Sequence, residues 1–322
     1  MGSDGRPTRR AFLERAGMGA FGAGLVLRAA AAHAQGAVPN SSGTARPTLQ
    51  APPLACDCHM HIYDPARFPL APVDRAAPTN AAVPQYRLLQ KRLGTMRVIV
   101  VNPRNYATDN RATLDAIAQM APNARGVAVV HPTIADGELK QFHAGGIRGI
   151  RFSLGDPKTA AVTEDMIEPL AKRIAALGWH VQINWTADQI AAAAALWNRL
   201  PTPLVFDHIG QLPAAGGLAH PAYAVIRRLL DAGRAWVKLS VTYTNSRVGP
   251  PGYDDVVQVG QALVKAVPER LVWGSNWPHP NEPKAPDDAQ LFDLMARWAP
   301  DEGTRRRILV SNPATLYEFA AS

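Results

Sequence analysis

Short apolar runs rich in β-branched residues alternate with longer segments of helical periodicity from Leu54 to the C-terminus. The apolar runs, which have the length of buried strands, are Leu54–His61, Met96–Val101, Gly126–His131, Ile147–Ser153, Trp179–Trp185, Leu204–His208, Trp236–Ser240 and Leu271–Asn276. The segments with helical spacing are Gln85–Leu93, Asn110–Met120, Asp136–Ala144, Glu164–Leu177, Ala187–Leu200, Pro221–Ala232, Asp254–Val267 and Asp287–Trp298. Such alternation is typical of parallel βα units and predicts an α/β protein, a (β/α)₈ TIM barrel.

The composition divides the 322 residues into three parts. Residues 1–34 carry Thr8-Arg9-Arg10-Ala11-Phe12, then a Gly- and Ala-rich apolar run that ends in a small-x-small pattern. We expect a twin-arginine signal peptide here, which would deliver folded protein through the twin-arginine export machinery to the periplasm. Residues 35–53, rich in Pro, Ser and Ala, read as a flexible leader, and residues 54–322 as one barrel domain.

The charge of the chain narrows the choice of partners. The net charge is +8, but the basic residues are scattered rather than clustered, so we expect no nucleic-acid partner. After residue 35 no stretch approaches the roughly 20 apolar residues of a membrane span, so none is expected in the mature form. A small anionic substrate is compatible with this surface.

The first predicted strand contains Cys56-Asp57-Cys58-His59-Met60-His61. Side chains alternate between the two faces of a strand, so we expect Asp57, His59 and His61 on one face. The two cysteines would then pack against a helix, and they lie too close along the strand to form an unstrained disulfide.

Polar residues gather where the other predicted strands end, and active sites of such barrels lie at those ends. The candidates from the later strands and the loops that follow them are Asn102, Arg104, Arg151, Asn184, His208, Lys238, Asn276 and His279. By strand parity we expect Asp207 to face a helix, because it lies opposite to His208. We expect His180 to lie in the bottom layer of the barrel, far from the chemistry.

Five of these segments together resemble the amidohydrolase superfamily. They are Asp57-Cys58-His59-Met60-His61, Gly149-Ile150-Arg151-Phe152, Phe206-Asp207-His208-Ile209-Gly210, Val237-Lys238-Leu239-Ser240 and Val272-Trp273-Gly274-Ser275-Asn276-Trp277-Pro278-His279-Pro280. The most similar branch is the one that contains 2-pyrone-4,6-dicarboxylate hydrolase and D-galactarolactone isomerase. The resemblance implies a (β/α)₈ barrel and chemistry at a carbonyl group.

Many members of the superfamily bind divalent metals through His-x-His, a residue of strand 4, further histidines and an Asp on strand 8. This sequence keeps His59, His61 and His208 but has Asn276 in place of the Asp. Three neutral imidazoles without an anionic ligand hold a dication poorly, so we expect no metal. The alternative is one zinc ion at His59, His61 and His208.

The resemblance and the residues together favour metal-independent isomerisation of a δ-lactone to a γ-lactone, since the isomerase of the branch also has Asn at this position. The substrate carboxylate would bind Arg151 and Lys238, with Asn102, Arg104, Asn184 and His279 as further substrate-binding residues. His208 would be the general base, because an ordinary histidine titrates near neutral pH. His59, His61 and Asn276 would bind the carbonyl oxygen as it becomes an oxyanion.

Three other functions remain open at this point. A lactonase or other carboxylic-ester hydrolase would activate water through a histidine. A metal-dependent hydrolase or decarboxylase would use the three-histidine zinc site. A periplasmic sugar-acid binding protein would retain the pocket without turnover.

Overall fold

The computed structural model describes residues 1–2, 36–72 and 75–320. It divides into two compact units, residues 1–37 and 38–322, and the strands and helices named below all belong to the second unit. The predicted signal peptide, residues 1–34, falls almost wholly outside the described residues.

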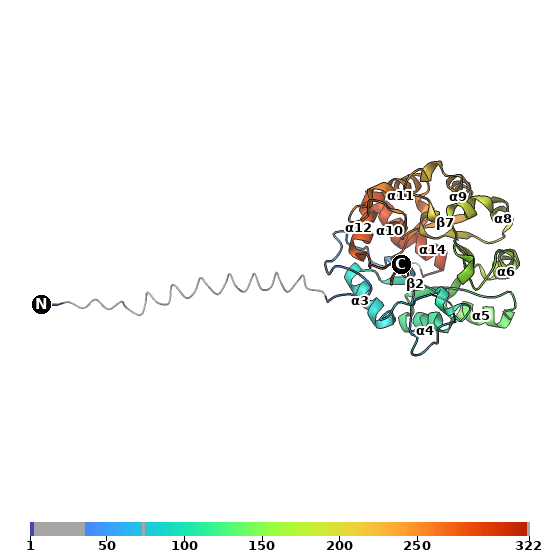
Figure 1. Ribbon diagram of the computed structural model, residues 1–322, viewed down its shortest axis with the longest axis horizontal. Coiled ribbons are helices and arrows are strands. Elements are labelled where there is room, and N and C mark those ends of the chain that lie inside the picture. Colours follow the sequence, from blue (N-terminus) through green and yellow to red (C-terminus); the bar gives the residue numbers. More distant parts are fainter. Residues whose placement is uncertain (3–35, 73–74, 321–322) are drawn as a thin grey trace. The chain divides into compact units, whose positions relative to one another are not determined.

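Eight parallel strands form one sheet in the order of the chain (Figure 1). They are β1 (Cys56–Met60), β2 (Arg97–Val101), β3 (Ala124–Ala128), β4 (Ile147–Ser153), β5 (His180–Asn184), β6 (Leu204–Phe206), β7 (Ala235–Leu239) and β8 (Leu271–Trp273). The segment after β8 returns to β1, where the Asn276 N–H donates to the His59 carbonyl at 2.7 Å and the His61 N–H to the Trp277 carbonyl at 2.8 Å. The predicted (β/α)₈ barrel is confirmed.

Helices follow the strands and surround the sheet in Figure 1. They are α3 (Val83–Leu93), α4 (Arg111–Met120), α5 (Asp136–Ala144), α6 (Ile167–Ile174), α7 (Ala187–Ala192), α8 (Ala194–Arg199), α9 (Pro221–Asp231), α10 (Thr242–Asn245), α11 (Asp254–Ala266), α12 (Asp288–Trp298), α13 (Glu302–Arg306) and α14 (Asn312–Tyr317). None of the helices in the described part of the chain is both long and apolar enough to cross a membrane.

The first strand departs from simple alternation. Asp57 pairs with Val98 but Met60 pairs with Val100, so β1 carries one extra residue between these positions. This bulge changes which residues face inward. Cys56 and Cys58 point into the barrel and belong to the inner apolar cluster with Ile99, Val127, Val205, Trp236, Val272 and Tyr317.

Asp57 therefore does not share a face with His59, and that expectation is wrong. Its carboxylate accepts hydrogen bonds from the Tyr86 hydroxyl of α3 at 3.0 Å and the Ser275 hydroxyl at 2.6 Å. The expectation that the cysteines pack against a surrounding helix is wrong for the same reason. The bulge leaves the two histidines of β1 and its following loop directed towards the barrel mouth, as the site requires.

Residues 38–53, which were expected to belong to a flexible leader, make specific contacts with the barrel. The buried Arg92 guanidinium donates to the carbonyls of Ala45 at 2.8 Å and Ser42 at 2.9 Å. The Trp277 indole N–H donates to the Pro39 carbonyl at 2.7 Å. Because Trp277 follows Asn276, this segment supports the loop that carries a candidate site residue.

His180 lies at the floor of the barrel, as expected. Its ring meets Tyr317 of α14 edge-on, with the ring centroids 5.4 Å apart. Neither ring nitrogen has a hydrogen-bond partner among the described residues. Burial, with a smaller contribution from the Lys238 ammonium, lowers the pKa of His180 to about 3.

We expect His180→Phe to reduce the acid sensitivity of the fold. The folded pKa is depressed, so His180 contributes stability above the unfolded pKa of about 6.5, and that contribution is lost as pH falls towards 3. As the pH is lowered from 6 to 4, the wild type should lose about 1.4 kcal/mol more of its free energy of unfolding per pH unit than the His180→Phe variant loses.

Urea denaturation at several pH values measures this slope. His59, His61 and His208 also make the free energy of unfolding decrease as the pH falls. Burial raises the pKa of Asp57 to about 6, so Asp57 has the opposite effect on this pH dependence. The difference between variant and wild type isolates His180, and parallel curves for the two proteins would refute the assignment.

Candidate active site

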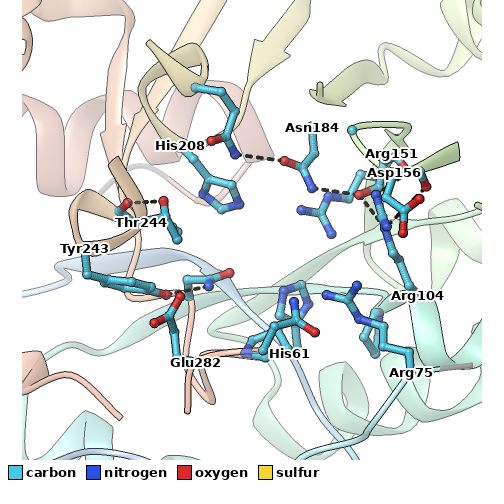
Figure 2. A pocket seen from close by; sticks show the side chains of 18 of the residues that line it. His61, Arg75, Arg104, Arg151, Asp156, Asn184, His208, Tyr243, Thr244 and Glu282 are labelled. Carbon is cyan, nitrogen blue, oxygen red and sulfur yellow. Dashed lines mark hydrogen bonds between the residues drawn. The ribbon is translucent and has the colours of Figure 1, made fainter. Parts of the chain in front are cut away.

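A cavity of about 300 Å³ opens at the C-terminal ends of the strands (Figure 2). Its polar lining comes from loops after most of the strands and consists of His61, Tyr63, Arg75, Arg104, Arg151, Ser153, Asp156, Asn184, His208, Gln211, Tyr243, Thr244, Asn276, Asn281 and Glu282. The cavity therefore lies where the active sites of (β/α)₈ barrels lie.

Six of the residues expected from the sequence line this cavity, namely His61, Arg104, Arg151, Asn184, His208 and Asn276. The other four, His59, Lys238, Asn102 and His279, are not part of the lining and are buried, with at most 2% of each residue exposed. The Asn102 amide donates to the Ala107 carbonyl at 3.0 Å and holds the loop that carries Arg104. These four residues support the wall instead of forming it.

The histidines of the first strand form a directed chain of hydrogen bonds. The His61 Nδ1–H donates to the Val101 carbonyl at 2.8 Å, which leaves the His61 Nε2 as an acceptor. The His59 Nε2 lies 3.3 Å from it and must carry the proton. The His59 Nδ1 can then accept from the Lys238 ammonium at 3.2 Å, and the Asp207 Oδ1 lies at the same distance from this nitrogen. His59 thus links Lys238 to His61.

Asp207 is the buried anion of this network. Its Oδ2 accepts from the Arg151 Nε at 2.9 Å and the Gln182 Nε2 at 3.0 Å, and the Lys238 Nζ lies 3.5 Å from its Oδ1. Burial opposes ionisation, but the His59 ring and the charges of Arg151 and Lys238 hold the pKa of Asp207 well below its usual range.

The expectation that Asp207 faces a helix is wrong. Val205 belongs to the inner cluster, so alternation along the strand turns Asp207 inward as well. His208 should then point outward, but its backbone adopts a left-handed conformation with φ of 53°, which brings its ring back to the mouth. The His208 Nδ1 lies 2.9 Å from the Ser240 hydroxyl, so its Nε2 is the nitrogen left for a bound molecule.

The imidazoles at the mouth are neutral at pH 7. Burial and the Arg151 charge lower the pKa of His61 to about 3. Burial lowers the pKa of His208 to about 3 as well, against the attraction of Asp207 and with smaller contributions from the Arg151 and Lys238 charges. Burial and the Lys238 ammonium hold the pKa of His59 well below its ordinary value. A general base works best with a pKa near the operating pH, so these rings are weak bases.

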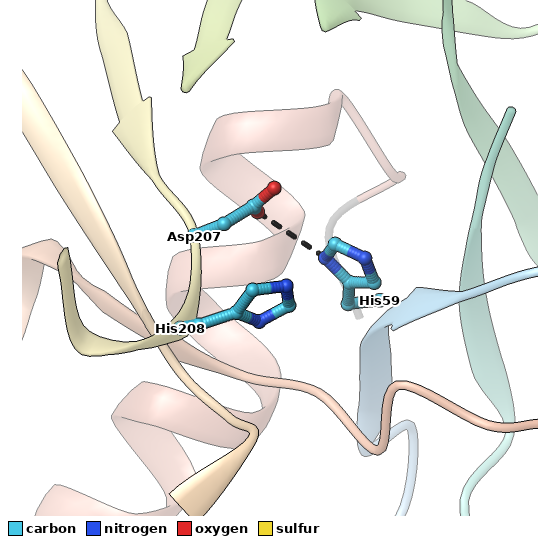
Figure 3. A group of neighbouring side chains, drawn as sticks. All are labelled: His59, Asp207 and His208. Carbon is cyan, nitrogen blue, oxygen red and sulfur yellow. Dashed lines mark ion pairs between the residues drawn. The ribbon is translucent and has the colours of Figure 1, made fainter. Parts of the chain in front are cut away.

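One group of side chains has the composition of a metal site. The candidate ligand atoms of His59, Asp207 and His208 lie within 4.8 Å of one another (Figure 3). However, the Lys238 ammonium lies 3.2 Å from the His59 Nδ1, and the Asp207 carboxylate already pairs with Arg151. A dication placed here would meet a buried ammonium at close range and compete with a guanidinium for its one anionic ligand. These residues do not fit a divalent metal.

Three guanidinium groups give one side of the cavity a positive charge (Figure 2). Arg104 is held by the Ser153 hydroxyl at 3.0 Å, the Ser153 carbonyl at 2.7 Å and the Thr159 hydroxyl at 2.7 Å. Arg151 lines the cavity and donates its Nε–H to Asp207, and its Nη groups have no hydrogen-bond partner among the described residues. Burial and the nearby Arg151 charge lower the pKa of Arg75. This side of the cavity fits an anion.

The opposite side carries Tyr243 and Glu282 (Figure 2), and Asn276 is bonded to Tyr243. The Asn276 amide donates to the Tyr243 hydroxyl at 2.8 Å, and the hydroxyl lies 3.0 Å from the His279 Nδ1. Burial raises the pKa of Glu282. Sequence reasoning missed Tyr63, Arg75, Tyr243 and Glu282, because they lie outside the strands, Tyr243 on the short helix α10 and the others on loops, where no strand parity identifies them.

Comparisons with known proteins agree with this geometry. The sequence profile of the family described as Amidohydrolase matches residues 56–319. The chain is 34% identical to the 2-pyrone-4,6-dicarboxylate hydrolase of Comamonas testosteroni, over 84% of this chain and 92% of that one. It is 32% identical to the D-galactarolactone isomerase of Agrobacterium fabrum, over 87% and 96% of the two chains. An apo crystal structure from Agrobacterium tumefaciens superposes with a TM-score of 0.77 at 31% identity, over 86% of this chain and all of that one.

We expect Asp207→Asn to destabilise the protein by about 3–5 kcal/mol, because Arg151 and Lys238 would remain buried without their counter-charge. Urea denaturation at pH 7.5 measures the loss. The matched control is Asp188→Asn, the same change at the exposed pair with His220, which should leave stability nearly unchanged. Equal stability of the two variants would contradict a central role for Asp207.

Proposed function

The chain belongs to the amidohydrolase family, and we propose that it is a lactone-acting enzyme whose substrate carries a carboxylate. The reaction we favour is metal-independent isomerisation, in which a substrate hydroxyl attacks the lactone carbonyl and a δ-lactone becomes a γ-lactone. The relatives named above act on a pyrone dicarboxylate and on galactarolactone, which supports this substrate class.

One observation carries the proposal. A single cavity is lined by three guanidinium groups and also by Asn276 and the neutral imidazoles of His61 and His208. Guanidinium binds carboxylate through paired hydrogen bonds, whereas neutral imidazole and amide groups suit an uncharged carbonyl. A lactone with a free carboxylate combines both features in one small molecule.

The three arginines of the cavity differ in how their side chains are held. Arg104 is fixed by three hydrogen bonds to Ser153 and Thr159, so it presents a preorganised surface. Arg151 is oriented by Asp207 and offers its Nη groups. The Arg75 side chain has no hydrogen bond to another described residue, so its donors remain available to the substrate carboxylate.

The lactone carbonyl would lie towards His61, His208 and Asn276. The His208 Nε2 and the second amide hydrogen of Asn276 are the groups that can donate to the developing oxyanion. His61 already donates its Nδ1–H to Val101, so it shapes the wall and is not an oxyanion donor in this arrangement. The attacking oxygen forms the new C–O bond, the ring C–O bond breaks, and the leaving oxygen takes the transferred proton.

Two features of the site support a reaction without metal or water. The Lys238 ammonium disfavours a dication beside His59 and Asp207. Asn276 cannot take a proton from water, whereas a hydroxyl of the bound substrate is already close to its target and needs no third molecule. Both features favour intramolecular transfer.

Hydrolysis is the second candidate, and Glu282 is the observation that favours it. Its carboxylate lines the cavity, and burial raises its pKa, which makes it a better proton acceptor than an ordinary glutamate. A water molecule held by Glu282 could attack the carbonyl in place of a substrate hydroxyl. The two reactions differ in the fate of solvent oxygen.

We expect the chain from Gln35 onward, treated with chelator, to convert D-galactaro-1,5-lactone to the 1,4-lactone without taking up oxygen from ¹⁸O-labelled water. Proton NMR identifies the product, and mass spectrometry detects the label. Open-chain acid that carries one labelled oxygen would identify a hydrolase and overturn the isomerisation. Loss of activity in chelator that zinc restores would overturn the metal-free reaction.

We expect Arg75→Gln to raise KM for this lactone about 10- to 100-fold with little change in kcat, because a hydrogen bond to a charged group contributes about 1.5–3 kcal/mol. D-Galactono-1,5-lactone, which lacks the carboxylate, should show no such change. Arg111→Gln, at an exposed arginine paired with Asp109 outside the cavity, is the matched control. Equal changes in KM for both lactones would show that Arg75 does not bind the substrate carboxylate.

A further inference from the structure

A line of four polar side chains runs from α12 to the cavity. The Asp288 Oδ2 lies 3.1 Å from the His279 Nε2, and the His279 Nδ1 lies 3.0 Å from the Tyr243 hydroxyl. The hydroxyl in turn accepts from the Asn276 amide at 2.8 Å. Tyr243 and Asn276 line the cavity, whereas His279 and Asp288 are 2% and 0% exposed. The line therefore connects a buried carboxylate to the place where a substrate binds.

The direction of each hydrogen bond follows from the chemistry of the ends. A carboxylate can only accept, so the His279 Nε2 carries a proton and donates it to Asp288. Its Nδ1 is then bare and accepts the Tyr243 hydroxyl proton. One lone pair of the Tyr243 oxygen accepts the Asn276 amide proton, and the other is left for a bound molecule. All three bonds have a donor and an acceptor in this single arrangement.

The surroundings of the line favour transfer of a proton along it. The second oxygen of Asp288 has no hydrogen-bond partner among the described residues, so His279 is the polar group that this buried carboxylate faces. Asn276 and His279 both adopt left-handed backbone conformations, with φ of 63° and 56°. Such conformations cost about 1–3 kcal/mol each and persist where the surrounding structure holds a functional geometry.

We propose that Tyr243, His279 and Asp288 form the proton relay of this site, with the Tyr243 hydroxyl as the group that exchanges a proton with the substrate. The inference rests on the proposed function and supplies its missing base. As the substrate oxygen attacks the carbonyl, its proton passes to the Tyr243 oxygen while the tyrosine's own proton passes to the His279 Nδ1. Asp288 stabilises the resulting imidazolium.

The same steps in reverse complete the reaction. When the ring C–O bond breaks, Tyr243 gives its proton to the leaving oxygen and recovers one from the His279 Nδ1. No proton is gained or lost over the cycle, and no further reactant is needed. Tyr243 is the catalytic residue because it touches the reacting atoms, whereas His279 and Asp288 act through it as positioning residues.

The rest of the site explains why a relay is needed. The imidazoles of His61 and His208 are weak bases beside the Arg151 charge, and the Asn276 amide cannot accept the proton. His279 differs because its neighbour is a carboxylate and its ring is separated from the cavity by a tyrosine. Glu282 is the competing candidate, since its carboxylate lies in the same cavity.

Kinetics of single and double variants test the relay. We expect Tyr243→Phe, His279→Gln and Asp288→Asn each to lower kcat about 100-fold or more with KM changed by less than about threefold, because general acid–base catalysis contributes about 10²–10⁴-fold. The double variants should be no slower than the slowest single one, since members of one unit are not additive. Tyr106→Phe and Asp188→Asn are matched controls outside the cavity and should retain kcat.

A second measurement needs no substrate. In ¹⁵N NMR spectra of the histidine rings, His279 should be protonated at Nε2 in the wild type, and Asp288→Asn should shift the His279 ring signals, because an amide can present its N–H as well as its C=O to Nε2 and no longer fixes the proton there. Asp188→Asn should leave the His279 signal unchanged. Loss of the signal in His279→Gln assigns it.

The outcomes separate the two proposals. If the wild type turns over no lactone, the proposed function fails, and a His279 ring protonated at Nδ1 in the wild type would overturn the relay independently. If lactones are turned over, an unchanged kcat in Tyr243→Phe, or additive losses in the double variants, would overturn the relay.

Glu282 is tested in the same way. Loss of turnover in Glu282→Gln but not in Tyr243→Phe would identify the Glu282 carboxylate as the base. If Asp288→Asn does not fold, the relay can still be tested by the kinetics of Tyr243→Phe, because Tyr243 is only half-buried and its substitution is less disruptive.

Discussion

The buried carboxylate of Asp207 is the interaction on which the site depends. Two cations, Arg151 and Lys238, lie with it inside the barrel, where each would be costly without a counter-charge. The pairing orients the Arg151 guanidinium towards the cavity and holds the Lys238 ammonium against His59. Burial, with a smaller contribution from the same cations, keeps the histidines of the mouth neutral, so the network orients the guanidinium and adds to the weak basicity of the imidazoles.

Different parts of the cavity wall carry different charges. In the proposed function the three guanidinium groups bind the substrate carboxylate and the neutral imidazoles meet the lactone carbonyl. A line of hydrogen bonds runs from Asn276 through Tyr243 and His279 to Asp288. Because the mouth histidines are weak bases, the proposed reaction needs a stronger proton acceptor elsewhere. The line of hydrogen bonds that ends at a buried carboxylate provides one without adding a second free charge to the cavity.

Several site residues lie where regular strand geometry breaks. The bulge in β1 turns His59 and His61 inward, and left-handed backbone at His208, Asn276 and His279 directs their rings or amide towards the mouth or the relay. Such conformations are unfavourable for residues other than glycine, and packing from neighbouring segments maintains them. Residues 38–45 contribute through Trp277 and Arg92, so a segment far away in the sequence supports the loop of Asn276.

The sequence by itself determined the architecture and about half of the cavity lining that carries chemistry. Alternation of apolar runs and helical segments is a local property, and it was sufficient to predict eight parallel strands and to place His61, Arg104, Arg151, Asn184, His208 and Asn276 at one end of the barrel. Only the tertiary structure decided which way Asp207 and Asp57 point. A strand bulge or a left-handed residue changes the face on which neighbouring side chains lie, and no sequence pattern indicates it. The tertiary structure also decided the charge state of the histidines and the contact between Tyr243, His279 and Asp288, since burial and through-space distance depend on how separate loops pack together.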